Sequence, residues 1–126
     1  AYGKIINIEA KTTADMAIRQ IIPAVSRYCA DLAANIQRKE SVGCSANAEK
    51  ALVKKLSEGT DALYSLCEKL KADLTNVPKI GIDAANYFSS VIVPDMDAVR
   101  AEADALELLT DKSYWPFPTY SDLLFY

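Results

Sequence analysis

Apolar residues recur along the first third of the chain at alternating spacings of three and four residues. This rhythm places them on one stripe of an α-helix and predicts a long helix over residues of about 6–40. Gly43 lies just beyond it and suits a helix end, because glycine tolerates a positive φ. The stripe consists of Ile22, Val25, Cys29, Leu32 and Ile36, widened by Ile18, Ile21 and Tyr28.

A second helix is predicted over residues of about 46–75, with Ser45 or Asn47 as its N-terminal cap. Its apolar seam repeats at four and three residues for nearly three heptads, as in a coiled coil. Gly59 falls on this seam, where a glycine costs about 1 kcal/mol relative to alanine. We therefore expect another helix to approach closely there. The seam consists of Leu52, Leu56, Gly59, Leu63, Leu66 and Leu70.

A third helix is predicted over residues of about 80–109, after the break at Asn76 and Pro78. Two adjacent apolar stripes favour a helix wedged between others. One contains Phe88, Ile92, Val99, Leu106 and Leu109, and the other Tyr87, Val91, Ala98, Ala101, Ala105 and Leu108. The charged positions are interpreted as a solvated face and not as a metal site. They are Asp95, Asp97, Arg100, Glu102, Asp104 and Glu107.

The tail, residues 110–126, differs from the helices because it holds six of the eleven aromatic residues. Pro116 and Pro118 prevent a helix and favour an extended path. So many aromatic side chains in a short segment are expected to pack into pockets, either on the chain's own bundle or on another domain or subunit. The sequence leaves both possibilities open. The predicted fold is all-α: an up-down-up bundle of three long helices with an extended aromatic and proline-rich C-terminal tail.

Two prolines fall inside apolar stretches of the first and third helices. Neither Pro23 nor Pro94 follows a capping residue, so each is predicted to bend a continuous helix. If the two parallel helices end at one level, the prolines differ in height by only about 3 Å. Matched bends would then let the bundle curve around another domain or a neighbouring subunit, although two unrelated kinks would fit the sequence nearly as well.

The composition excludes several classes of function. The chain has 126 residues, a net charge of −3 and no histidine, which removes His-dependent triads and most zinc sites. No basic block indicates nucleic acid, no apolar run is long enough for a membrane, and the four glycines form no phosphate-binding loop. The three cysteines form no CxxC pair, and Cys29 and Cys67 fall at core positions. Reduced thiols favour the cytoplasm.

Several segments, taken in order along the chain, resemble type III glutamine synthetases. Near the start these are residues 6–12 (INIEAKT) followed by 16–17 (MA), then 21–25 (IIPAV) followed by Tyr28. In the third helix they are residues 93–100 (VPDMDAVR) and 103–107 (ADALE), and in the tail residues 115–125 (WPFPTYSDLLF). The middle helix matches only in its apolar periodicity. The resemblance implies that the chain is the C-terminal part of a longer enzyme.

That family joins ammonia to glutamate through a γ-glutamyl phosphate, using ATP and magnesium or manganese, in a large cytoplasmic homo-oligomer. The family's metal and nucleotide ligands lie in motifs that this chain lacks, so the resemblance assigns it no catalytic, cofactor or metal residue. The resemblance implies a non-catalytic domain for assembly or stability, with the enzyme's own catalytic domain and neighbouring subunits as partners. The candidate interface consists of Trp115, Phe117, Tyr120, Leu123, Leu124 and Phe125.

Two alternatives remain. A free-standing helical adaptor could bind a partner through the aromatic tail. An independent bundle enzyme is the weakest possibility, because bundle metal sites use histidine and the chain has none.

Overall fold

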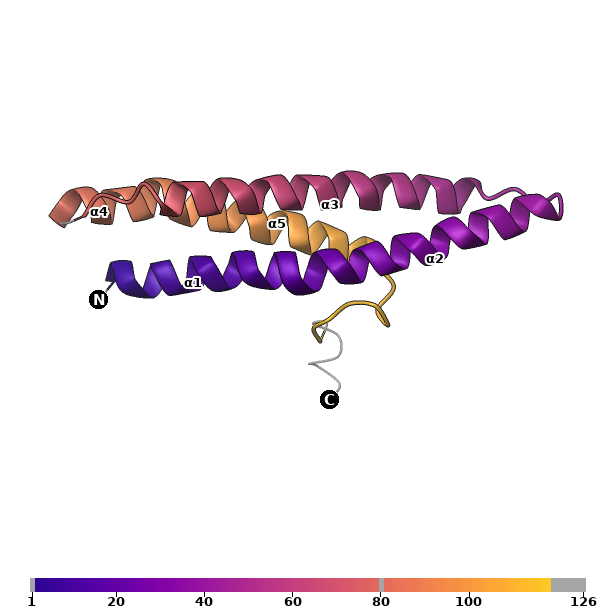
Figure 1. Ribbon diagram of the computed structural model, residues 1–126, viewed down its shortest axis with the longest axis horizontal. Helices are drawn as coiled ribbons and strands as arrows, with labels where there is room; N and C mark the ends of the chain where they lie inside the picture. The colour runs from indigo at the N-terminus through magenta and orange to yellow at the C-terminus, as the bar shows by residue number, and fades with distance from the viewer. Residues whose placement is uncertain (1, 80, 119–126) are drawn as a thin grey trace.

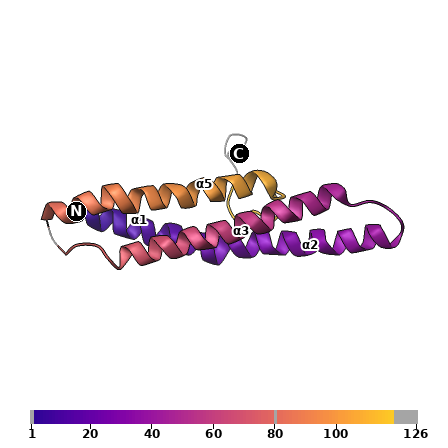
Figure 2. The same cartoon turned by 90° about the horizontal axis from the view of Figure 1, so that it is seen from above.

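The computed structural model describes residues 2–79 and 81–118, and helices dominate this part of the chain. Three long helices run up, down and up, so the predicted all-α fold is confirmed (Figures 1 and 2). The first long helix contains α1 (Tyr2–Met16), η1 (Ala17–Ile21) and α2 (Ile22–Ser41), and the second is α3 (Asn47–Leu74). The third contains α4 (Gly81–Tyr87), η2 (Phe88–Ile92) and α5 (Val93–Leu109).

Each proline follows a short π-helical turn, η1 or η2, inside a continuous helix. The amide of Ile22 donates to the carbonyl of Ala17, and that of Val93 donates to Phe88, in each case five residues back. A proline ring collides with the carbonyl four residues earlier, and the wider π turn makes room for it. Both helices are thus continuous through their prolines, as predicted, and the irregularity before each proline is a π turn. That the prolines bend the two helices stays a prediction.

The α2–α3 connection closes on Gly43, whose φ is +83°. The amide of Cys44 donates to the carbonyl of Lys39 at 2.9 Å, and the amide of Gly43 donates to Glu40 at 3.1 Å. These are the two bonds of a Schellman motif. The predicted cap of the next helix is wrong, because Ala46 holds the N-cap position of α3 and makes no side-chain cap bond. Ion pairs of Lys39 with Glu49 and of Lys50 with Glu40 bridge the two helix ends instead.

The core follows the predicted seams at most positions, but Cys67 is buried in place of Leu66, and Met96 and Ala103 are buried although neither predicted stripe includes them. On α3 the buried residues are Leu56, Gly59, Leu63, Cys67 and Leu70, and on the third helix they include Phe88, Ile92, Met96, Val99, Ala103 and Leu106. The close approach expected at Gly59 is present, against Leu106 of α5. The second predicted stripe of the third helix is only partly covered. Ala101 and Ala105 are exposed and Leu108 is 87% exposed, because none of the described helices packs on that side.

The third helix is displaced along the bundle relative to the first. A Cβ on Gly3 would lie 3.0 Å from the ring of Phe88, so these two residues stand at one level. Pro94 is then level with about Glu9, fourteen residues before Pro23, which is about 21 Å of helix at ~1.5 Å per residue. The expectation of prolines at matched heights is therefore wrong, since the two helices do not end together.

The same displacement leaves the far end of the molecule with two helices instead of three. Leu109 ends α5 while α2 and α3 continue to their connecting loop (Figures 1 and 2). We call this part, residues 32–56, the two-helix arm. Its buried side chains are Leu32, Ala46 and Leu56.

Candidate functional site

The chain reverses direction immediately after α5. The hydroxyl of Thr110 donates to the carbonyl of Leu106 at 2.7 Å and closes the helix end. The Oδ1 atom of Asp111 accepts the amide of Ser113 at 2.8 Å and its hydroxyl at 2.9 Å. These two bonds hold the pKa of the Asp111 carboxyl below its usual range. The amide of Tyr114 donates back to the carbonyl of Asp111 at 2.9 Å, which completes the turn.

Tyr114 fastens this turn to α2. Its hydroxyl donates to the carboxylate of Asp31, and its ring lies 5.1 Å from that of Tyr28 at an interplanar angle of 42°. The hydrogen bond to Asp31 is the main cause that raises the pKa of Tyr114. Burial is the main cause that raises the pKa of Tyr28. No short-range pattern in the sequence points to this contact, because Asp31 and Tyr114 lie far apart along the chain.

Trp115 and Phe117 then pack against the core, where both are half-buried, while Pro116 and Pro118 are exposed. The two rings line an open groove of about 510 Å³ between α1 and α5. Figure 1 shows the tail leaving the end of α5 and turning back beneath the bundle. For these two residues, the structure shows the tail packed on the chain's own helices.

The groove has an apolar floor and a mainly acidic rim. Its buried floor residues are Ala17, Ile21, Val99 and Ala103, and its charged rim residues are Glu9, Arg100, Asp104 and Glu107. At the end nearest the N-terminus, Ile8 lines the groove and Ile5 lies one helical turn beyond it, and each is 58% exposed. This end of the groove is therefore less covered than the end at the two tail rings.

The other four predicted interface residues lie outside the part of the chain that the structure describes. They are Tyr120, Leu123, Leu124 and Phe125. Their role at an interface stays a prediction.

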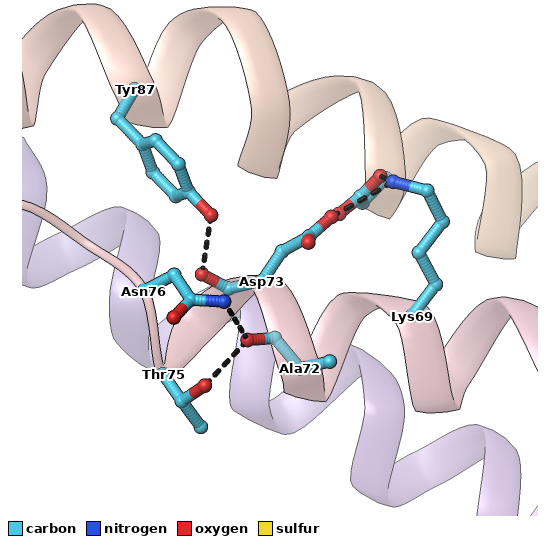
Figure 3. Close-up of polar contacts among 7 residues, drawn as sticks. Lys69, Ala72, Asp73, Thr75, Asn76 and Tyr87 are labelled. Carbon is cyan, nitrogen blue, oxygen red and sulfur yellow. Dashed lines mark hydrogen bonds and ion pairs between the residues drawn. The ribbon is translucent and has the colours of Figure 1, made fainter.

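A polar cluster joins the end of α3 to the start of α5 (Figure 3). The Nζ atom of Lys69 lies 2.8 Å from Asp73 Oδ2 and 2.8 Å from Asp95 Oδ1. The hydroxyl of Tyr87 donates to the backbone carbonyl of Asp73 at 2.7 Å. Asp95 is only 8% exposed, and its buried Oδ2 atom accepts no hydrogen bond from the residues that the structure describes. The prediction of a fully solvated acidic face is therefore wrong for Asp95.

The pKa values of the two carboxyls in this cluster are shifted in opposite directions. Burial, followed by the hydrogen bond with Asp73, raises the pKa of Asp95. The hydrogen bond with Asp95, followed by that from Lys69, lowers the pKa of Asp73. The two carboxylates raise the pKa of Lys69, so its ammonium stays charged. The cluster therefore ties α3 to α5 by charge, and a single cation is shared between two acids.

Among residues 2–79 and 81–118, no group of three or more Cys, Asp or Glu side chains is placed to hold a metal ion. Within the same ranges, no helix is long and apolar enough to span a bilayer. Cys67 is buried, as predicted, but Cys29 is only half-buried and Cys44 is exposed.

Comparison with known proteins shows which proteins the chain is similar to. Residues 1–40 match the family model described as the glutamine synthetase C-terminal domain. The glutamine synthetase of Butyrivibrio fibrisolvens is 29% identical over 128 residues, covering 98% of this chain and 18% of that protein. Glutamine synthetase of Bacteroides fragilis (strain YCH46) and type-3 glutamine synthetase of Dictyostelium discoideum are each 26% identical, with the same two coverages.

The chain thus spans less than a fifth of the length of these relatives, but the similarity runs through nearly all of it. The start of the chain matches a C-terminal domain model, and a type-3 enzyme is among the relatives. These findings confirm the resemblance that the sequence motifs carry: the chain is similar to the C-terminal domain of type III glutamine synthetases.

Proposed function

We propose that the chain is the non-catalytic C-terminal helical domain of a glutamine synthetase and serves the assembly or stability of that enzyme. The full-length enzyme would join ammonia to glutamate with ATP and magnesium or manganese, in the cytoplasm. The observation that carries the proposal is the extent of the similarity. It covers 98% of this chain but only 18% of each relative, and the matching model is that of a C-terminal domain.

An assembly role is supported by the surface that the tail builds. Trp115 and Phe117 stand half-exposed beside a groove whose far end shows Ile5 and Ile8 to solvent. Aromatic and aliphatic side chains grouped in this way are typical of contact surfaces. The proposed partners are the enzyme's own catalytic domain and neighbouring subunits of a homo-oligomer.

Deletion of residues 1–126 from the full-length enzyme tests this role. We expect the shortened enzyme to lose subunits or to dissociate at lower protein concentration, as measured by light scattering coupled to gel filtration. A full-length enzyme carrying Val42→Ser, a change at an exposed residue far from the groove, is the matched control. An unchanged mass and melting temperature after the deletion would contradict an assembly or stability role.

The lack of catalysis is tested on the 126-residue chain alone. We expect no heat of binding on titration with Mg-ATP and no glutamine formed, because the resemblance carries no ligand set onto this chain. Micromolar binding of Mg-ATP would refute the proposal.

A free-standing adaptor is the second candidate, favoured by the same half-exposed rings of Trp115 and Phe117. The gene separates the two candidates. Several hundred residues encoded upstream of Ala1, with glutamine synthetase motifs among them, support the enzyme domain. A short gene without them supports the adaptor.

A further inference from the structure

We propose that the groove between α1 and α5 receives the two-helix arm, residues 32–56, of a second copy of the chain. The contact joins the apolar floor and acidic rim of the groove to the uncovered, basic side of the arm. The inference rests on the assembly role proposed above, of which it is one form. It is tested on the 126-residue chain, so its failure would leave that role to other surfaces of the domain.

Charge is distributed unevenly along the molecule. The whole chain has a net charge of −3, but the two-helix arm holds five basic and two acidic residues. The third long helix, residues 81–109, holds one basic and six acidic residues. The arm is therefore positive, and the helix that forms one wall of the groove is negative. Two copies attract each other when the arm of one meets the groove of the other.

The acidic rim of the groove is not neutralised by the chain's own basic residues. Arg100, the basic member of the rim, lies 3.8 Å from Asp97 on its own helix. The three acidic members, Glu9, Asp104 and Glu107, form no ion pair within residues 2–79 and 81–118. The floor between them is apolar. The groove therefore suits an occupant that brings positive charge together with apolar side chains.

The arm has a side of this kind on α3. Lys55 and Leu52 lie four and seven residues before Gly59, the residue of α3 on which α5 packs closely. They continue the same face of α3, but beyond the end of α5 none of the described helices covers it. Leu52 is half-buried there. Lys55 and its neighbour Lys54 are exposed and form no ion pair with a described residue.

The arm cannot reach the groove of its own chain. It lies beyond the end of α5, whereas the groove follows α1 and α5 in the three-helix part of the molecule (Figures 1 and 2). The helices α2 and α3 run without a break between the two places, so the arm has no hinge about which to fold back. The contact therefore has to form between copies.

Reversal of charge on each side tests the contact. Lys54→Glu with Lys55→Glu makes this side of the arm acidic, and Glu9→Lys with Asp104→Lys makes the rim of the groove basic. In sedimentation equilibrium at up to about 1 mM chain, the wild type should associate, and added salt should weaken the association. Each double variant alone should stay monomeric. An equimolar mixture of the two should associate again, because the acidic arm of one variant then meets the basic groove of the other.

Lys71→Glu with Lys79→Glu is the matched control, because it gives the chain the same net charge as the arm variant. Both lysines are exposed and lie toward the other end of the bundle. This control should associate more strongly than the arm variant, with the same helix content by circular dichroism. A monomeric wild type would overturn the proposal and point to a partner of different sequence. Equal loss of association in the control, or a mixture no heavier than its components, would also overturn it.

Carbodiimide crosslinking locates the contact in the wild-type chain, because it joins only amines and carboxylates that already touch. Labelled and unlabelled chains are mixed, so that peptides linked between copies can be told apart by mass spectrometry. We expect Lys54 or Lys55 of one copy to be linked to Glu9, Asp104 or Glu107 of another. Links between copies that lead mainly to acidic residues outside the groove, such as Asp61 and Asp83, would contradict the proposed contact.

Discussion

Gly59 of α3 lies directly against Leu106 of α5: a Cβ placed on the glycine would be 2.6 Å from Leu106 Cδ2 and 3.3 Å from its Cγ. Leu106 is 1% exposed, so its side chain would have to shift within the core to make room for a Cβ. The glycine costs the helix about 1 kcal/mol relative to alanine. The close contact between the two helices offsets that cost.

Gly59→Ala should therefore destabilise the chain, because overpacking of about 1–3 kcal/mol exceeds the gain of about 1 kcal/mol in helix propensity. We expect a net loss of about 1 kcal/mol in the free energy of unfolding by urea. In a Leu106→Ala background, the same change should stabilise by up to about 1 kcal/mol, since the obstructing methyl is gone. An equal effect in both backgrounds would contradict the close contact.

Tyr114→Phe should loosen the tail turn. It removes the hydroxyl that donates to Asp31 and leaves the ring against Tyr28. We expect a loss of about 1 kcal/mol in unfolding free energy, together with a red shift of Trp115 fluorescence as the neighbouring indole gains water. In an Asp31→Ala background, Tyr114→Phe should cost much less. Full additivity of the two changes would mean that the hydroxyl and the carboxylate do not interact.

Trp115→Ala should reduce stability by about 1–2 kcal/mol, roughly half the cost of removing a fully buried tryptophan. Truncation after Asp111 should cost more, because it also removes Tyr114 and Phe117 and uncovers the groove. Tyr64→Ala is the matched control: this ring is 52% exposed on α3 and does not line the groove, so its loss should change stability by about 0.5 kcal/mol or less. A truncated chain with an unchanged melting temperature would mean that packing of the tail on the bundle does not contribute to stability.

The carboxyl pair gives the stability a dependence on pH with two opposite contributions. The pKa of Asp95 is raised in the folded chain, so its contribution is present at acid pH and is lost as pH rises through that value. The pKa of Asp73 is lowered, so its contribution is present above the ordinary carboxyl range and is lost as pH falls. The two variants below separate these effects.

Relative to the wild type, Asp95→Asn should lose less unfolding free energy at about pH 7 than at about pH 3. At pH 7 the neutral amide avoids the cost of burying an ionised carboxylate. Asp73→Asn should show the reverse, with its larger loss near pH 7. Urea unfolding at both pH values measures each difference. Parallel pH profiles for the two variants would rule out the opposite assignment of the two acids.

The sequence predicted the three helices, their direction and the α3 seam, because burial on one face imposes a repeat that survives without any knowledge of the partner helix. It also located the close approach at Gly59. Asp95 was misassigned although a signal was present. It lies three residues after Ile92 and four before Val99, which is the spacing of the buried stripe, but its charge was given more weight than its position.

Other features had no local signal. The longitudinal offset between the first and third helices depends on which side chains pack against each other, as Gly3 and Phe88 do. The apolar repeat of each helix is the same at any offset, so it cannot predict this one. The contact of Tyr114 with Asp31 depends on that offset. The proline spacing indicated an interruption of each helix, but the extra residue of a π turn is decided by local packing.

The two-helix arm gives the molecule a gradient of local stability along its length. Where α5 is present, opening one helix uncovers a core closed from three sides. Beyond Leu109, opening uncovers little more than Leu32, Ala46 and Leu56, so the arm should unfold locally at a smaller free-energy cost. Amide protons around the α2–α3 loop would then exchange through these partial openings. Those beside Leu63 and Ile92 would exchange only when the whole chain unfolds, which makes the arm more compliant than the three-helix part of the domain.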